Sequence, residues 1–198
     1  MDYSAVEVLD SDSSIAENFL TSRAFNLHNA ANIGDKQIIQ EILDSNPLLA
    51  FETNVEGDTP LHVAARLGRL DVAKLLVDKF CGNGEGSVLV DHEGGNKKKE
   101  LLRMTNNEKS TAVHEAVKNG QYEIVKFLIR EDSSLVSSIN DDGESPLFMA
   151  VDRELYEIAN CILSNIDYVK GDRCYTSWSG RNGMTAMHAA VIRKQDST

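Results

Sequence analysis

Apolar and polar positions along this chain recur in a pattern that is longer than a single helix. A Thr or Ser followed by a short, Ala-rich apolar run occurs in a weaker copy at 27–31 and in four full segments, 59–65, 111–117, 145–151 and 185–191. The step from Leu27 to Leu61 is 34 residues, and the step from Val113 to Leu147 is 34 residues again. A fixed period of this length is typical of stacked supersecondary units, so we predict a repeat array rather than one closed core.

Each full copy predicts an inner helix with a defined start. The hydroxyl of Thr59 can cap the helix by accepting a hydrogen bond from an early backbone N–H, and Pro60 suits the first helical position. Ser145 and Pro146 repeat this arrangement. The small side chains that follow, such as Ala64, allow neighbouring inner helices to pack closely.

An outer helix is predicted after each inner helix, with a tight turn between them. Val72 and Leu76 have the i, i+4 spacing of one helical face, and the same spacing recurs in the next two copies. Gly68 and Gly120 occupy the turn, where a left-handed backbone favours glycine. Glu154 replaces this glycine in the following copy, so we expect that turn to be distorted or extended. Polar turn signals before each capping residue complete a unit of hairpin, inner helix, turn and outer helix.

Two spacings exceed the period and locate insertions. The first two full copies are 52 residues apart and the last two are 40 residues apart, which exceeds the period by 18 and by 6. We predict that the surplus residues form loops at 79–105 and 165–180. The larger insertion contains Gly-rich stretches at 82–86 and 94–96, a composition that does not build a core. Because closure entropy changes slowly with loop length, we expect a deletion within 82–99 to leave the fold intact.

The expected architecture is an all-α solenoid of about five repeats, preceded by an acidic segment at 1–22. The array covers 23–198, and its last repeat is expected to be incomplete, because polar residues at 194–196 stand where the other copies turn into an outer helix. The expected repeats lie near 23–56, 57–78, 106–139, 140–164 and 181–198.

Three histidines recur at one repeat position and could suggest a metal site. His62, His114 and His188 would be held about 10 Å apart by stacking, whereas a metal ion lies about 2 Å from each ligand. Phe148 occupies the same position in the third full copy, and a phenyl ring cannot bind a metal. We therefore predict that each imidazole ties the hairpin to the helix start by hydrogen bonding, and we expect no metal or cofactor.

Catalytic motifs are not apparent in the sequence. The Gly-rich stretch 82–86 lacks the Gly-Lys-Ser/Thr ending of a phosphate-binding loop. No Ser, Cys or Thr lies in a recognisable nucleophile turn. We predict that the chain is not an enzyme.

Composition and charge narrow the class of partner. The 198-residue chain is 41% hydrophobic and carries a net charge of -11 at pH 7, which argues against nucleic acid, because phosphate contacts need clustered Lys and Arg. The chain has no run of 18 apolar residues, so we expect no insertion into a membrane. Three cysteines without a C-x-x-C pair, and an N-terminus without a secretory signal, indicate a cytoplasmic location.

The charge is unevenly spread along the chain. Residues 131–172 hold ten acidic side chains against Arg153 and Lys170, whereas 97–99 and Arg103 form a basic group in the larger insertion. These runs are either solvated surface, or an acidic face that selects a basic partner with the basic group as a separate handle.

Two further segments leave alternatives open. Tyr168, Tyr175 and Trp178 in the smaller insertion either fold over the nearest helices or contact a partner. Ser14 begins a predicted capping box, and the acidic surroundings of Ser11 offer the alternative of a phosphorylation site.

The repeated phrase and its spacing resemble the ankyrin repeat. Segments 101–107, 111–117 and 180–192 further resemble the plant accelerated-cell-death type of ankyrin protein, as does the Gly-rich, Lys-bearing insertion. That resemblance implies a cytosolic ankyrin array followed by a C-terminal membrane domain, with roles in defence and stress signalling. Because the chain ends at Thr198 within the fifth repeat, we expect a fragment of a longer protein or a short gene product. The membrane role is therefore not carried over to these residues.

These observations predict a non-enzymatic scaffold that binds another protein, as the cytosolic module of a plant defence or stress signalling protein. The alternative is an assembly module of a multi-pass, channel-like or transport-associated membrane protein, located at the cytosolic face of the plasma membrane. The oligomeric state is left open. We expect binding at the hairpin tips and the inner-helix face, where polar residues vary on a fixed frame. The candidate contact residues are Glu56, Asp58, Arg66, Arg69, Lys109, Lys118, Asn119, Asp142, Glu144, Asp152, Arg153 and Arg181.

Overall fold

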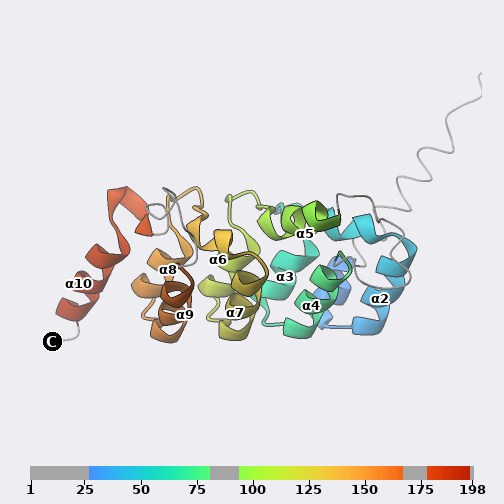
Figure 1. Cartoon of the computed structure of the whole chain (residues 1–198), viewed down its shortest axis with the longest axis horizontal. Coiled ribbons are helices and arrows are strands. Elements are labelled where there is room, and N and C mark those ends of the chain that lie inside the picture. Colours follow the sequence, from blue (N-terminus) through green and yellow to red (C-terminus); the bar gives the residue numbers. More distant parts are fainter. Residues whose placement is uncertain (1–26, 81–93, 167–177, 197–198) are drawn as a thin grey trace, which may run out of the picture.

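The fold is an elongated stack of paired helices. A computed structural model describes residues 27–80, 94–166 and 178–196 of the chain. In Figure 1 the helices follow one another along the long axis, from α2 at one end to α10 at the other. Within the described residues, β-type pairing is limited to two isolated bridges, Thr105 with Thr111 and Ser179 with Thr185. The all-α solenoid predicted from the sequence is confirmed.

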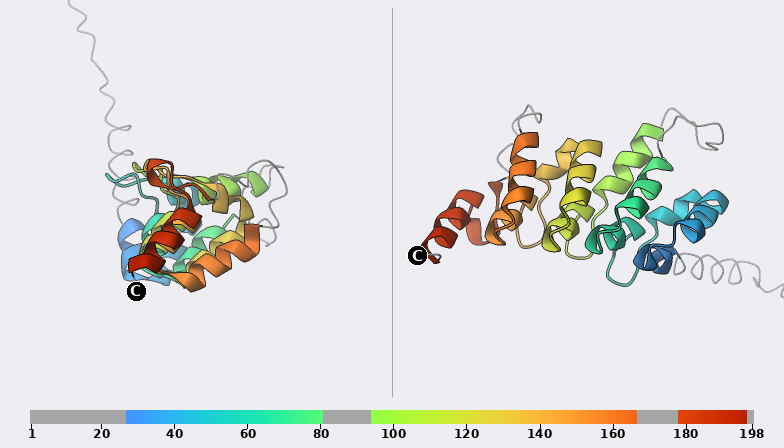
Figure 2. Two further views of the ribbon diagram at one scale, coloured as in Figure 1. Left: turned by 90° about the vertical axis from the view of Figure 1, so that its left-hand side faces the viewer. Right: turned by 90° about the horizontal axis from the view of Figure 1, so that it is seen from below.

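Five repeats can be followed along the stack. The first contains a helix at 27–33, α2 (Lys36–Ser45) and η1 (Pro47–Phe51). The others comprise α3 (Pro60–Arg66) with α4 (Leu70–Asp78), α6 (Ala112–Lys118) with α7 (Tyr122–Glu131) and η2 (Ser133–Ser137), α8 (Pro146–Asp152) with α9 (Tyr156–Ile166), and η4 (Arg181–Gly183) with α10 (Ala186–Asp196). Helices α3, α6, α8 and α10 pack in one layer, and α2, α4, α7 and α9 pack in the other, as Figure 2 shows from two further sides.

The inner helices begin as their sequences predict. The Thr59 hydroxyl accepts a hydrogen bond from the backbone N–H of His62 at 3.4 Å, and Pro60 is the first helical residue. Ala64 and Ala65 are fully buried between neighbouring inner helices. Small side chains therefore allow close stacking along the inner layer.

The turns between inner and outer helices share one geometry, including the turn that lacks glycine. Gly68 and Gly120 have φ values of 71° and 68°, and Glu154 has a φ of 61°. The backbone N–H of Leu155 donates to the carbonyl of Ala150 at 2.8 Å, as its counterparts do in the preceding repeats. The expected distortion of this turn was wrong. The turn is kept, and the strain of a left-handed backbone falls on Glu154.

The larger insertion is not entirely a loop, which corrects the prediction for 79–105. Residues 94–103 form α5 (Gly94–Arg103), which packs against α4. Leu101 and Leu102 are each 1% exposed and belong to the hydrophobic core. The remainder of this insertion at 81–93, including the Gly-rich stretch 82–86, lies outside the described residues.

Basic residues of this insertion join α5 to the third repeat rather than extending into solvent. The Lys98 ammonium lies 2.5 Å from the Glu131 carboxylate. The Arg103 guanidinium lies 2.6 Å from Asp132 and also donates to the Ser134 hydroxyl at 2.9 Å. These two residues therefore do not form the separate handle that the sequence offered as an alternative.

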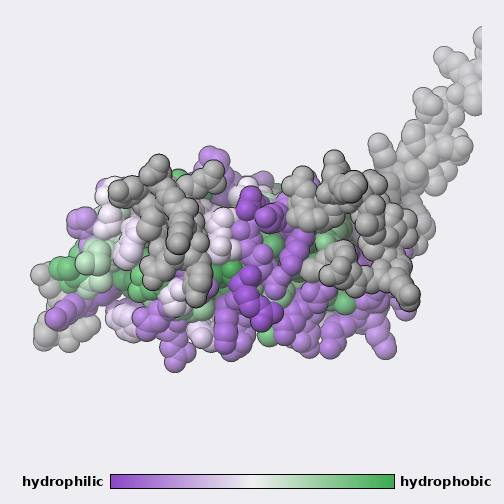
Figure 3. Space-filling model, in the orientation of Figure 1, coloured by the Kyte–Doolittle hydropathy of each residue, from purple (hydrophilic) through white to green (hydrophobic). Residues whose placement is uncertain are grey.

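The last helix differs from the other inner helices. Helix α10 spans 11 residues, whereas α3, α6 and α8 span 7 each. It continues through the segment 194–196, where the earlier repeats turn. Apolar side chains of α10 remain exposed, and Figure 3 shows hydrophobic surface at this end of the molecule; they are Met187, Val191 and Ile192.

Candidate interaction surface

Histidines at the start of the inner helices connect each repeat to the next. The backbone N–H of Thr59 donates to Nδ1 of His62 at 3.2 Å, which leaves Nε2–H to donate to the carbonyl of Ser110 at 3.0 Å. His114 makes the same bond to the carbonyl of Glu144 at 3.2 Å, and His28 lies 2.8 Å from the Asp58 carbonyl. The predicted hydrogen-bonding role is confirmed, and the structure adds that the ring reaches the following hairpin.

Burial keeps these imidazoles neutral. It lowers the pKa of His114 to about 4, because the charged form would lose hydration. Burial also lowers the pKa of His62 below its ordinary value. Among the residues that the structure describes, no three His, Cys, Asp or Glu side chains are grouped to hold a metal ion.

Phe148 takes the histidine position in the fourth repeat, and its surroundings are changed to fit. A Cβ on Gly180 would lie 2.0 Å from the Phe148 ring, so only glycine fits beside it. Asn106 and Asn140 occupy the position of Gly180 in the preceding hairpins. The backbone N–H of Ser145 has no imidazole to pair with, and it donates instead to the carbonyl of Ser179 at 2.8 Å.

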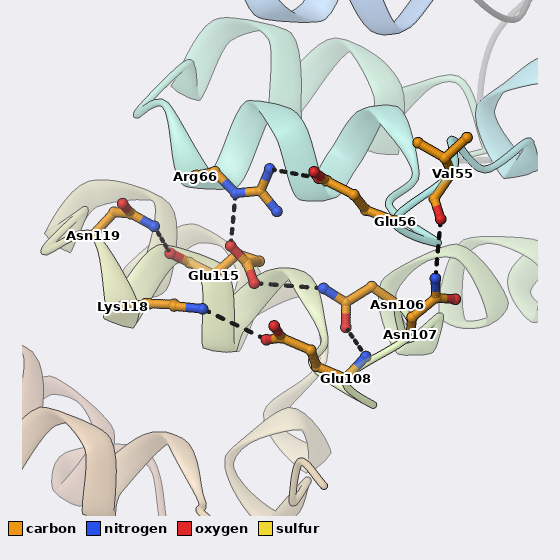
Figure 4. Close-up of a pocket in the computed structure, with 9 residues that line it drawn as sticks. All are labelled: Val55, Glu56, Arg66, Asn106, Asn107, Glu108, Glu115, Lys118 and Asn119. Atoms are coloured by element: carbon orange, nitrogen blue, oxygen red, sulfur yellow. Dashed lines mark hydrogen bonds and ion pairs between the residues drawn. The ribbon is translucent and has the colours of Figure 1, made fainter. Parts of the chain in front are cut away.

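A polar hollow lies between the hairpins and inner helices of the second and third repeats. Its volume is about 550 Å³, and Figure 4 shows side chains from α3, α6 and both hairpins converging on it. The residues that line it are Val55, Glu56, Arg66, Asn106, Asn107, Glu108, Glu115, Lys118 and Asn119.

Arg66 organises the floor of this hollow. Its Nε donates to Glu115 at 2.8 Å, its Nη2 is paired with Asp58, and its Nη1 lies 3.6 Å from Glu56. The amide of Asn106 donates to Asp58 at 3.0 Å. Burial opposes the charge on Arg66, but its hydrogen bonds to Glu115 and Asp58 outweigh that effect and raise its pKa above the ordinary value. The floor is therefore a fixed, fully paired network.

The rim of the hollow is open to solvent. The side chains of Glu56 and Glu108 are each 66% exposed, and Lys118 lies 3.5 Å from Glu108. Val55 at the hairpin tip is 96% exposed. Asn107 donates its side-chain amide to the Val55 carbonyl at 3.1 Å, which links adjacent tips. The rim thus offers exposed charges and one apolar side chain on a rigid support.

The candidate contact residues are divided by the structure. Glu56, Arg66, Lys118 and Asn119 meet at the hollow. Arg69 lies elsewhere: it donates to the carbonyl of Asn32 at 3.4 Å and packs over Gly34 at the turn of the first repeat.

Two candidate carboxylates are buried, which corrects the expectation that they lie exposed at hairpin tips. Asp58 is fully buried under Arg66, and Glu144 is 7% exposed. In both cases the following hairpin covers the acid. Burial raises the pKa of Glu144, and the nearby Arg181 opposes this shift.

The remaining candidates lie toward the C-terminal end of the array. Arg181 lies 2.6 Å from Asp152 and 3.5 Å from Glu144. Lys109, with a left-handed φ of 53°, lies 2.6 Å from Asp141 of the next hairpin. The last two candidates, Asp142 and Arg153, are exposed.

Sequence reasoning missed Glu115, Asn106 and Glu108. Glu115 was detectable, because it stands in an inner helix where the neighbouring repeats have Val63 and Met149. A polar residue at a buried position indicates a buried partner.

The smaller insertion is described only at its end. Trp178 is half-buried and packs against the hydrophobic core, which favours the packing alternative. Tyr168 and Tyr175 lie outside the described residues, as do Ser11 and Ser14. Across the described part of the chain, none of the helices has the length and apolar character needed to span a bilayer.

Comparison with known proteins agrees with this architecture. The family model described as ankyrin repeats (3 copies) matches residues 4–85 and again 87–172. Protein ACCELERATED CELL DEATH 6 of Arabidopsis thaliana is 29% identical over 143 residues, which cover 71% of this chain and 21% of that protein.

Two animal proteins are also similar over shorter segments. Ankyrin repeat and SAM domain-containing protein 6 of Rattus norvegicus is 29% identical over 109 residues, covering 55% of this chain and 10% of that protein. SMC5-SMC6 complex localization factor protein 1 of Homo sapiens is 43% identical over 51 residues, covering 26% and 5%. The chain thus spans at most 21% of the length of these three relatives.

Proposed function

Because the chain belongs to the ankyrin-repeat family, we propose that it is a non-enzymatic scaffold that binds another protein through its hairpin tips and the hollow between α3 and α6. The hollow is the observation that supports this most. Its floor is fixed by the paired Arg66, whereas the rim residues Glu56 and Glu108 remain exposed. A rigid support under solvent-accessible side chains lowers the entropy that a partner must lose on binding.

The charge of this surface favours a basic partner. Four acidic groups surround the hollow, two on the floor and two on the rim, against the cations Arg66 and Lys118. Asp142 continues the acidic tips into the next hairpin. A segment with Lys or Arg side chains complements this distribution, and the net charge of -11 would speed its approach.

A cytoplasmic role in plant defence or stress signalling is the finer proposal. It draws support from the similarity to Protein ACCELERATED CELL DEATH 6, of which this chain covers 21%. The second candidate is an assembly module of a larger membrane protein, supported by the same partial coverage. A coding sequence that continues into long apolar segments would favour the second candidate.

The experiment uses the whole chain as bait in plant extract, followed by direct binding of the captured protein. In the rim variant, Glu56→Gln and Glu108→Gln remove two exposed charges beside the hollow. In the matched control, Glu123→Gln and Glu157→Gln remove two exposed charges from the outer helices α7 and α9.

We expect the rim variant to bind the captured protein at least about tenfold more weakly, because two exposed acids lose their pairing with the partner. The control variant should bind like the wild type. Equal affinity of the wild type and the rim variant would contradict the proposed surface.

A further inference from the structure

The joint between the fourth and fifth repeats lacks the links that hold the earlier joints. Adjacent hairpin tips are bonded where the Asn107 N–H donates to Glu56 at 3.1 Å and the Asp141 N–H donates to Glu108 at 2.9 Å. Within the described residues, no such backbone bond extends from the Arg181 N–H to the preceding tip. Only the bond from Ser145 to the Ser179 carbonyl crosses this joint in place of a histidine bridge.

Apolar contact across this joint is also small. The hydrophobic residues that α10 buries are Ala186 and Ala189, whereas Met187 and Val191 are 66% and 58% exposed. Helix α8, by comparison, buries Leu147 and two further large side chains. Because hydrophobic stabilisation scales with the apolar area removed from water, α10 is the most weakly packed of the inner helices.

Ion pairs take over at this joint, and they converge on one acid. The Asp152 carboxylate at the end of α8 lies 2.6 Å from Arg181 and 3.0 Å from Arg193. Arg181 also lies 3.5 Å from Glu144 and places its guanidinium 5.9 Å from the Phe148 ring. Both arginines belong to the fifth repeat, and all of their partners belong to the fourth.

We propose that the fifth repeat is an ionic latch, which opens and closes as a unit over 178–194 and is held closed by the charge of Asp152. This follows from the array itself and does not depend on the proposed partner. Since Arg181 closes the latch, a partner that pairs with Arg181 or Asp152 would have to open it. By thermodynamic reciprocity, opening would then favour that partner, so salt and competing charges set the length of the closed array.

Amide hydrogen exchange on the whole chain tests the latch. From about 20 mM to about 500 mM salt, protection of 186–194 should fall by about fivefold, because partly exposed ion pairs are screened. Protection of α4, which is held by apolar burial, should stay constant. Asp152→Asn should reproduce this loss at low salt.

The matched control is Asp141→Asn, which removes an exposed carboxylate paired with Lys109 across the preceding joint. It should leave protection of 186–194 unchanged. The proposal is overturned if protection of 186–194 does not depend on salt or on Asp152. It is also overturned if α4 loses protection in parallel, since the fifth repeat would then open only with the whole array.

A second variant rebuilds the missing bridge. Phe148→His with Gly180→Asn copies the residues found at the joint between His62 and Asn106. It should raise the protection of 186–194 and reduce its dependence on salt. Protection that stays as salt-dependent as in the wild type, in a variant with native helical content, would show that the missing bridge is not the reason for the latch.

Discussion

At the scale of single residues, buried polar groups connect one repeat to the next. His62 and His114 each use one ring nitrogen inside their own repeat and the other on the following hairpin. Such bonds require a neutral ring, because Nδ1 must accept the N–H of the capping threonine. The cohesion of the stack is therefore linked to the protonation of these histidines.

Stability should fall in mild acid because of His114. Its pKa is about 4 in the folded chain against 6.5 for an ordinary histidine, so the unfolded state binds a proton first. The contribution is present above pH 6.5 and is lost as pH falls toward 4, with a total of about 3 kcal/mol from this residue. Urea unfolding at a series of pH values would measure it.

The fourth repeat supplies the control for this titration. His114→Phe with Asn140→Gly copies the natural pair Phe148 and Gly180 and removes the titrating ring. The pH dependence of the unfolding free energy should flatten in this variant, leaving the share of His62. A variant that keeps the full acid sensitivity of the wild type would show that His114 is not its source.

Glu154 is the other residue whose cost can be measured. It adopts the left-handed conformation that Gly68 and Gly120 adopt in the equivalent turns. Glu154→Gly should raise the unfolding free energy by about 1 kcal/mol, since the steric strain removed exceeds the entropy added to the unfolded chain. Arg153→Gly, at an adjacent position with φ -97°, should lower stability in the same denaturation experiment. Destabilisation by both substitutions would contradict the assigned strain.

At the scale of helices, local signals predicted the repeats well and the insertion poorly. Caps such as Thr59-Pro60 and the spacing of Val72 and Leu76 act within one repeat, so they are readable from the sequence. Helix α5 begins with two glycines and carries only Leu101 and Leu102 as large apolar residues. Its burial depends on tertiary contact with α4, which no local pattern encodes.

The insertion should therefore contribute to stability where it forms α5. Leu101→Ala should lower the unfolding free energy by about 2–5 kcal/mol, because the leucine is almost completely buried in the core. Glu100→Ala, at the exposed neighbouring position, should change it by less than about 0.5 kcal/mol. Chemical denaturation distinguishes the two. If Leu101→Ala is as mild as its control, α5 does not pack on the stack in solution.

At the scale of the whole molecule, the sequence located the binding face better than its individual residues. Hairpin tips were predicted because turn signals recur with the repeat, and Glu56 and Asp142 are exposed there. The burial of Asp58 and Glu144 depends on the next hairpin lying over them, which a pattern inside one repeat does not contain. Arg66 and Glu115 likewise meet only because two repeats stack.

Because each repeat contacts only its neighbours, position in the stack should decide how far a local defect spreads. Leu43 in α2 and Leu128 in α7 are both fully buried leucines of outer helices. Helix α7 packs against α6, α4 and α9, whereas α2 at the end of the stack packs against η1 and α4. Each Leu→Ala change should cost about 2–5 kcal/mol locally. Leu128→Ala should therefore lower hydrogen-exchange protection in α4 and α9 as well as in α7, because opening the central repeat breaks two interfaces. Leu43→Ala should confine its effect to the first repeat. Equal loss of protection throughout the array in both variants would mean that the stack opens as one indivisible unit, and nearest-neighbour coupling would not describe it.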